Sequence, residues 1–291
     1  MSNITKTAVV SVVGRPNVGK STMTNKLVGQ KVAIVSNKPQ TTRTRITGVL
    51  NRGETEYFFL DTPGQHKPRS RLGDYICKVV TDTVSEVDVA ALVVEPIANI
   101  GPAEQSLIGQ IKQHHMPSIL VINKIDTVKK EELLAVIATY AAAHDFDAVV
   151  PVSARTGEGL NDFLAEVDKY AIEGPQLFPE DMVSDQPERQ LVAEIIREKM
   201  LRLLDREVPH GVAVGIERWN EREDGLIEIN AVIYCEKNSH KSIIIGKQGA
   251  MLKEIGRQAR ADIERMLDAK VFLELWVKVK EGWRNNQYQM R

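Results

Sequence analysis

The chain has 291 residues, a length typical of about two domains. Hydrophobic residues make up 43% and charged residues 26% of the sequence, which fits a globular protein and excludes collagen-like, mucin-like and acidic-tail chains. Thirty-eight Lys plus Arg against 39 Asp plus Glu give a net charge of −1, so any surface that binds nucleic acid must be local.

Cysteine content and the N-terminus indicate the compartment. Two cysteines, Cys77 and Cys235, are too few for a disulfide framework and favour a reducing environment. The first fifteen residues lack the basic start and cleavage site of a signal peptide, and every apolar stretch is far shorter than the roughly 20 residues that span a bilayer. We therefore expect a soluble cytoplasmic protein, which could still touch a membrane surface.

From residue 7 to about 170, short β-branched runs alternate with helical patterns. This alternation predicts an α/β fold with a mainly parallel sheet and helices on both faces. The expected strands are 8–13, 57–60, 87–94, 118–122 and 148–152, and the expected helices are 21–28, 73–84, 102–113, 130–143 and 160–170.

The order of elements changes after residue 173. Gly174 and two prolines that follow it break the periodicity and indicate a linker. Beyond it the pattern predicts a separate α+β domain. Its expected elements are a helix at 187–204, strands at 212–219 and 226–235, helices on both sides of Gly246, and a strand at 271–279. The predicted organisation is a first domain at 1–174, a linker at 175–186 and a second domain at 187–291.

The sequence GRPNVGKS at 14–21 follows an apolar strand and precedes a helix, as a phosphate-binding loop does. Its backbone amides would surround phosphate oxygens, Lys20 would neutralise the β and γ phosphates, and the Ser21 hydroxyl would hold Mg²⁺. Taken alone, the motif leaves a simple glycine turn open and does not identify the nucleotide. The predicted phosphate-site residues are Gly14, Arg15, Pro16, Asn17, Val18, Gly19, Lys20, Ser21 and Thr22.

The sequence DTPG at 61–64 directly follows the strand expected at 57–60. An acidic residue at a strand end beside a phosphate-binding loop can bind Mg²⁺, usually through water, and the Gly64 amide can sense a γ-phosphate. An isolated motif of this kind is more often a simple turn. We include Asp61, Thr62, Pro63 and Gly64 in the predicted site.

The sequence NKID at 123–126 follows the expected strand Ser118–Ile122 and indicates the base. The Asp126 carboxylate can accept hydrogen bonds from both N1–H and the exocyclic amine of guanine, whereas adenine would leave it unpaired. The tripeptide SAR at 153–155 closes the next strand, where a small residue lets a backbone N–H reach guanine O6. The predicted guanine-site residues are Asn123, Lys124, Asp126, Ser153, Ala154 and Arg155.

The sequence PQTTRTR at 39–45 forms a polar loop between the first helix and the next strand. A threonine hydroxyl in this loop can complete Mg²⁺ coordination while the γ-phosphate is present and release it after hydrolysis. A solvated basic loop would be the preferred interpretation if the other motifs were missing. Their shared order at the ends of successive strands favours a nucleotide-dependent switch.

These motifs, together with REKMLRLLDREVPH at 197–210 and LELWVKVKEGW at 273–283, resemble the bacterial Era family of translation-factor-like GTPases over nearly the whole chain. The resemblance implies GTP and GDP as ligands, Mg²⁺ as cofactor, and Thr42, with Thr41 as the alternative, as the Mg²⁺-binding switch threonine. It also implies that Asn17 contacts K⁺. The implied catalytic residues are Lys20, Thr42, Asp61 and Gly64, and the implied metal ligands are Ser21, Thr42 and Asp61.

The resemblance also implies a biological role. It points to a ribosome-assembly factor that binds the 3′ end of 16S rRNA on the 30S subunit, acts as a monomer, and associates peripherally with the inner face of the cell membrane. Gln65 departs from the family, which commonly has an apolar residue there. Ras-like GTPases orient the attacking water with a glutamine at this position, but we expect Gln65 to be a tolerated loop residue.

A GxxG sequence, Gly246 to Gly249, lies between two helical segments of the second domain. The order of elements around it looks like a type II KH domain, which clamps about four nucleotides of single strand with this loop. Seven basic residues against three acidic ones between 237 and 265 give a local surplus that favours RNA. We expect Trp276 and the run 243–245 to belong to the core. The predicted RNA-binding residues are Ile245, Gly246, Lys247, Gln248, Gly249 and Lys253.

Two functions of other classes remain open from the sequence. A metabolic kinase would share the phosphate-binding loop but has no use for NKID and SAR, so nucleotide competition distinguishes it. A constitutive RNA-binding protein with a structural nucleotide would bind RNA equally with GTP and GDP. A single nucleotide domain followed by KH argues against the tandem-domain and tRNA-modifying relatives.

Overall fold

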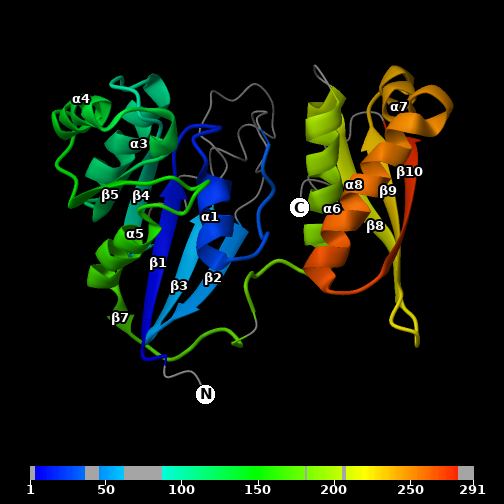
Figure 1. The fold of residues 1–291 in the computed structure, drawn as a ribbon, viewed down its shortest axis with the longest axis horizontal. Helices are drawn as coiled ribbons and strands as arrows, with labels where there is room; N and C mark the ends of the chain where they lie inside the picture. The colour runs from blue at the N-terminus through cyan, green and yellow to red at the C-terminus, as the bar shows by residue number, and fades with distance from the viewer. Residues whose placement is uncertain (1–3, 37–45, 62–86, 181, 205–207, 281–291) are drawn as a thin grey trace. The chain divides into compact units, whose positions relative to one another are not determined.

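The structure is a computed structural model that describes residues 4–36, 46–61, 87–180, 182–204 and 208–280 (Figure 1). Contacts divide the chain into two units, one made of 1–33 and 42–185 and the other of 34–41 and 186–291. Several predictions lie outside the described residues, namely those on Thr41, Thr42, Thr62, Pro63, Gly64, Gln65, Cys77 and the helix at 73–84. Within the described part of the chain, no helix has both the length and the apolarity to cross a bilayer.

The first unit is built on a seven-stranded sheet with the order β2-β3-β1-β4-β5-β6, and β7 pairs with β1. The strand pairs β3–β1, β1–β4, β4–β5 and β5–β6 are parallel, which confirms the predicted fold class. In contrast, β2 and β7 run antiparallel to their partners. The strands are β1 (Lys6–Val13), β2 (Ile46–Arg52), β3 (Thr55–Asp61), β4 (Val89–Val94), β5 (Ser118–Ile122), β6 (Ala148–Pro151) and β7 (Ile172–Glu173).

The sequence analysis did not identify β2. It forms a hairpin with β3, and Gly53 in the connecting turn has φ 61°, a conformation that glycine adopts readily. The sequence pattern does not predict this strand, because Thr47, Gly48 and Asn51 interrupt its apolar residues. Since β2 starts at Ile46, the predicted switch loop at 39–45 leads directly into an edge strand of this sheet.

Helices cover both faces of the sheet, as predicted (Figure 1). One face packs against α1 (Lys20–Val28) and α5 (Leu160–Val167), and the other against α3 (Pro102–Gln113) and α4 (Lys130–Ala141). All six residues of β4 are therefore buried. Burial on both faces explains why the central strands read as continuous apolar runs.

The segment predicted as a linker lies along the free edge of β2 and along β3. Val49 N–H donates to Val183 O at 2.9 Å, and the Asp185 carboxylate accepts from the Thr47 hydroxyl at 2.8 Å. Further along, the buried Glu56 carboxylate accepts from the backbone N–H groups of 177 and 178 at 2.7 and 3.1 Å. Residues up to 185 therefore belong to the first unit.

The second unit has a three-stranded sheet with the order β10-β9-β8, in which β10 is parallel and β8 antiparallel to β9. Helices α6, α7 and α8 contribute to one apolar core with this sheet. The order of elements is the one predicted for a type II KH domain. The elements are α6 (Glu188–Leu203), β8 (Val212–Glu221), β9 (Ile227–Cys235), α7 (Asn238–Ile245), α8 (Ala250–Leu267) and β10 (Val271–Val279).

The expectation that Trp276 belongs to the core is wrong, because its side chain is 57% exposed. Along β10 the odd-numbered residues from 271 to 279 face the core, and the period of two puts Trp276 on the opposite face. The run 243–245 lies on a helix, so its residues face different directions. Ile244 is buried, whereas Ile243 is 47% exposed. Cys235 is a buried free thiol.

Candidate nucleotide site and RNA-binding groove

The phosphate-binding loop connects β1 to α1 and contains two glycines that no other residue could replace. Gly14 has φ 152°, and a Cβ on it would lie 2.4 Å from Val93 O in the neighbouring strand. Gly19 has φ 102°, and its Cβ would lie 2.2 Å from the Asn123 side-chain nitrogen. Both glycines are thus required by backbone conformation and by close approach, and the loop packs tightly against the strands beside it.

Lys20 is buried inside this loop. Its Nζ donates to Gly14 O at 2.9 Å and to Arg15 O at 3.0 Å, so the side chain curls back over the loop that it belongs to. Burial lowers the pKa of Lys20 to about 8, and the negative charge of Asp61 opposes that shift. Burial removes the water that stabilises an exposed ammonium group, and the negative charge of a bound polyphosphate would replace that stabilisation.

Asp61 ends β3 and has no exposed surface. One carboxylate oxygen, Oδ2, accepts from the Ser21 hydroxyl at 2.6 Å, while the buried Oδ1 has no hydrogen-bond partner among the residues that the structure describes. Burial raises the pKa of Asp61 to about 6, although Lys20 and the Ser21 hydroxyl lower it. A buried oxygen without a partner beside a hydroxyl at a phosphate-binding loop fits a hydrated Mg²⁺, which takes few protein ligands and keeps several waters.

The guanine motif follows β5, and its first residue connects three loops. Asn123 is 2% exposed, its amide nitrogen donates to Val18 O at 2.7 Å, and its amide oxygen accepts from the Ala154 N–H at 2.9 Å. In the structure this N–H therefore holds the SAR loop in place, and its contact with guanine O6 stays a prediction. Lys124 has φ 66° and donates to Asn17 O at 2.7 Å, which adds a second connection to the phosphate-binding loop.

Asp126, the predicted guanine-reading residue, is oriented by the SAR loop. Its Oδ1 accepts from the Ser153 hydroxyl at 2.6 Å, and its Oδ2 pairs with the Arg155 guanidinium at 2.5 Å. The Ser153 hydrogen bond and the Arg155 charge hold the pKa of Asp126 below its ordinary value, against the opposing effect of desolvation. The carboxylate is therefore ionised and can accept two hydrogen bonds from a base.

Two carboxylates of this site were not identified from the sequence. Glu95 directly follows β4, and Glu104 lies in the first turn of α3; both form ion pairs with Arg15. Neither residue belongs to a recognisable motif. The topology offers the missing signal, because β4 lies between β1 and β5, and a charged residue that follows it must lie between the loops that follow its neighbours.

In the second unit, the GxxG sequence connects α7 to α8. Gly246 has φ 72°, and a Cβ on it would lie 2.7 Å from Met251 Cβ, so the chain must turn closely over the start of α8. Gly249 has φ 78° and faces open space, and no atom of the described residues beyond its chain neighbours lies within 4 Å of the position of its Cβ. Gly246 therefore shapes the loop, whereas Gly249 leaves room for a ligand at the N-terminus of a helix, where backbone N–H groups favour phosphate.

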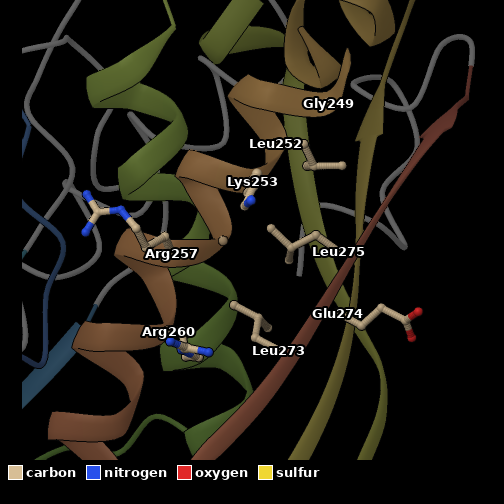
Figure 2. A pocket seen from close by; sticks show the side chains of 9 residues that line it. Gly249, Leu252, Lys253, Arg257, Arg260, Leu273, Glu274 and Leu275 are labelled. Atoms are coloured by element: carbon tan, nitrogen blue, oxygen red, sulfur yellow. The ribbon is translucent and has the colours of Figure 1, made fainter. Parts of the chain in front are cut away.

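A groove of about 510 Å³ begins at Gly249 and runs between α8 and β10 (Figure 2). Basic side chains lie on the helix side, and apolar side chains cover much of the groove between helix and strand. Of the predicted RNA-binding residues, Gly249 and Lys253 line it. The full lining is Gly249, Leu252, Lys253, Gly256, Arg257, Arg260, Leu273, Glu274 and Leu275.

The spacing of residues along α8 is a sequence signal for this groove. Positions 249, 253, 256 and 260 follow each other at intervals of three or four, which puts them on one face of α8. Gly256 lies in the middle of that face, where helix formation does not require a glycine. A Cβ there would lie 3.4 Å from Leu275. The leucines of β10 could not be assigned, because their contact with α8 depends on how the two elements pack.

Comparisons with known proteins match the chain both by domain and over nearly its whole length. A family model described as 50S ribosome-binding GTPase matches residues 9–124, and a KH domain model matches residues 207–284. GTPase Era of Ruminiclostridium cellulolyticum is 53% identical over 286 residues, covering 98% of this chain and 96% of the relative. GTPase Era of Clostridioides difficile is 49% identical and covers 97% and 96%, respectively.

Solved structures give the same result. A variant of Aquifex aeolicus Era bound to GDP·AlF₄⁻ has a TM-score of 0.94 and 39% identity, with 98% of each chain covered. A second structure, of Era with MgGDPNP and nucleotides 1506–1542 of 16S ribosomal RNA, has the same TM-score and identity and covers 99% of this chain and 98% of that one. The chain has the nucleotide motifs and the KH domain, and it is about half identical to Era GTPases over nearly its whole length. It therefore belongs to the Era family of GTPases and hydrolyses GTP.

Proposed function

We propose that this GTPase is a nucleotide-dependent switch that binds the 3′ end of 16S rRNA and assists assembly of the small ribosomal subunit. The observation that carries the proposal is a guanine-nucleotide site and a basic, partly apolar groove beside a GxxG loop in one chain. The similar Era structure contains MgGDPNP together with nucleotides 1506–1542 of 16S rRNA, which supports both ligands.

In the proposed reaction, the protein contributes positioning and fixed charge rather than a covalent step. The loop amides and Lys20 hold the phosphates, while Asn123 fixes the loop that carries Asp126 against the base. The Lys20 ammonium, already desolvated, would neutralise charge that develops on the phosphoryl oxygens. Without an activating partner we expect slow turnover, about 10⁻⁴ to 10⁻² s⁻¹, as for unassisted switch GTPases.

Mg²⁺ would be held by the Ser21 hydroxyl and, through water, by Asp61, with Thr42 as the proposed third protein ligand. The unpartnered Asp61 Oδ1 supports this assignment, and no cluster of three or more His, Cys, Asp or Glu side chains suited to a metal occurs in the described ranges. When bound, the ion would neutralise phosphate charge and link the β and γ phosphates. Deprotonation of Asp61 is the condition for this role.

In the RNA-binding groove, Lys253, Arg257 and Arg260 would contact the sugar-phosphate backbone while Leu252 and Leu275 would face bases. Arg257 is partly neutralised by an ion pair with Glu254 at 2.6 Å. Lys253 and Arg260 form no ion pair with any other described residue, so they are the stronger phosphate contacts. The groove's local charge is what allows a nearly neutral protein to bind RNA.

We also propose that the protein is a cytoplasmic monomer, that it associates peripherally with the inner face of the cell membrane, and that K⁺ bound near Asn17 stimulates hydrolysis. Asn17 has φ 67° inside the phosphate-binding loop, where a cation would lie beside phosphate. Faster hydrolysis in KCl than in NaCl at equal ionic strength supports the K⁺ site, and equal rates contradict it. Light scattering measures the oligomeric state, and vesicle sedimentation measures the membrane association.

The switch itself is tested by RNA affinity in the GTP-analogue, GDP and nucleotide-free states. We expect the three affinities to differ, because a switch must bind its target differently in its two states. Equal affinities would indicate a constitutive RNA-binding protein instead.

Replacing Asp126 by Asn should change the preferred base from guanine to xanthine, because the amide can donate to a 2-oxo group where the carboxylate accepted from an amine. GTP affinity should fall roughly a hundredfold, as expected when a site built to pair a polar group meets the wrong partner. Competition between GTP and XTP measures the change, with Asp162→Asn on an exposed turn of α5 as the control. A variant that still prefers GTP contradicts the assignment.

The pH dependence of nucleotide binding should reveal Asp61. Because burial raises its pKa to about 6, Mg²⁺-dependent GTP affinity should fall as the pH drops through that value. The sign is opposite for folding without nucleotide: the protonated carboxyl is favoured in the folded state, so its stabilisation is present at acid pH and lost as the pH rises through about 6. GTP titrations with and without Mg²⁺ test this, and Asp61→Asn should lose the pH step.

Replacing Gly249 by Asp should weaken RNA binding at least about tenfold, because the new carboxylate projects into the groove mouth and repels phosphates. Gly225→Asp is a matched control: Gly225 has φ 80°, faces open space and does not line the groove. Both variants accept a similar left-handed strain of about 1 kcal/mol. The logarithm of wild-type RNA affinity should fall with the logarithm of salt concentration at a slope near −0.7 per neutralised phosphate, and the slope for Gly249→Asp should be shallower. Equal RNA affinities of the two variants would remove the groove from the proposal.

A further inference from the structure

Glu95 occupies the middle of the nucleotide-binding edge of the first unit. In the sheet, β4 lies between β1 and β5, and the three strands are parallel. The phosphate-binding loop follows β1, and the guanine motif follows β5. A residue that directly follows β4 therefore lies between the two loops that hold opposite ends of the nucleotide.

The Glu95 carboxylate contacts both loops, one with each oxygen. Oε2 accepts from the Arg15 guanidinium in the phosphate-binding loop, and Oε1 accepts from Lys124 Nζ in the guanine motif at 2.5 Å. These partners are 80 and 29 residues away along the chain. Lys124 also donates to Asn17 O at 2.7 Å, so ammonium and carboxylate together close a connection across the two loops.

The charges of this cluster are balanced. Arg15 has a second acidic partner, Glu104, at 3.2 Å, and Glu104 is 3% exposed. Two cations and two carboxylates therefore meet beside the nucleotide site. Partial burial disfavours ionisation of Glu95, but Lys124 and Arg15 outweigh it and hold the pKa of Glu95 below its ordinary value. The carboxylate keeps its charge at neutral pH.

We propose that Glu95 is a positioning residue that sets the spacing between the phosphate loop and the guanine loop by binding Arg15 and Lys124 at once. Glu95 acts through these two side chains and does not touch the reacting phosphate. A guanine nucleotide must fill both subsites simultaneously, so the binding energy depends on the distance between them.

The magnitudes indicate an effect on binding rather than on folding. The side chains of Arg15, Glu95 and Lys124 are 36%, 25% and 36% exposed, and ion pairs with that exposure add little to stability. In contrast, a nucleotide makes contacts in both loops at once, so its affinity depends on how well the distance between them is fixed before binding. Loss of Glu95 should therefore leave the nucleotide-free fold intact and weaken GTP and GDP alike.

Glu95→Gln tests the inference in the full-length protein, since the amide keeps the shape but loses the charge and presents an N–H₂ donor to one of the two cations. We expect the KM for GTP and the Kd values for GTP and GDP to rise roughly tenfold, with kcat changed less than about twofold. Glu95→Asp keeps the charge on a shorter side chain and should lie between Gln and wild type. Glu166→Gln is the control, because Glu166 is 28% exposed and pairs with Lys169 at 2.5 Å outside the site.

Two further measurements separate positioning from a general structural role. The melting temperature of the nucleotide-free Glu95→Gln protein should equal that of Glu166→Gln, and the effect of Glu95→Gln on affinity should shrink in an Arg15→Ala background. Wild-type affinity in Glu95→Gln, a loss of kcat at constant KM, or full additivity with Arg15→Ala would each overturn the inference while leaving the GTPase assignment intact.

Discussion

The nucleotide site depends on one buried side-chain amide, that of Asn123. It donates to Val18 O in the phosphate-binding loop and accepts from Ala154 N–H in the loop after β6, so three loops from three strands are joined at one point. A Cβ on Gly19 would occupy the place of this amide, which couples the glycine to the asparagine. The parallel sheet brings the loops to one edge, and Asn123 fixes their positions there.

Around Asn123, the site contains buried polar and charged groups whose missing partners a nucleotide and its ion would supply. Within the described part of the chain, Asp61 has a buried oxygen without a partner, and Lys20 is buried with backbone carbonyls as hydrogen-bond acceptors. A buried polar group without a partner costs about 1–3 kcal/mol in the unliganded fold. A ligand that supplies the missing partners would return that cost on binding.

The second unit solves a different problem, which is to bind a polyanion with a chain whose net charge is −1. Its basic residues are not spread evenly, because Lys253, Arg257 and Arg260 follow one face of α8 toward the open glycine at 249. Gly256 on the same face leaves space beside Leu275. The basic side chains and the missing side chain of Gly256 together form the groove, and helical periodicity places them on one face.

The sequence alone determined the parts of this protein whose chemistry is local. GRPNVGKS, NKID and the GxxG loop each place neighbouring functional residues within a single loop, and the alternation of strands and helices predicted where those loops lie. The pattern did not predict the β2 edge strand, because polar residues and a glycine interrupt its short apolar run.

Only the tertiary structure decided which side chains meet across the chain. Arg15 and Glu95 are 80 residues apart, Ser21 and Asp61 are 40 apart, and Lys124 reaches Glu95 from a third strand. The β10 leucines face α8 only because the sheet and the helix pack together. Such contacts have no spacing signal in the sequence, since they arise from strand order and packing rather than from helical or strand periodicity.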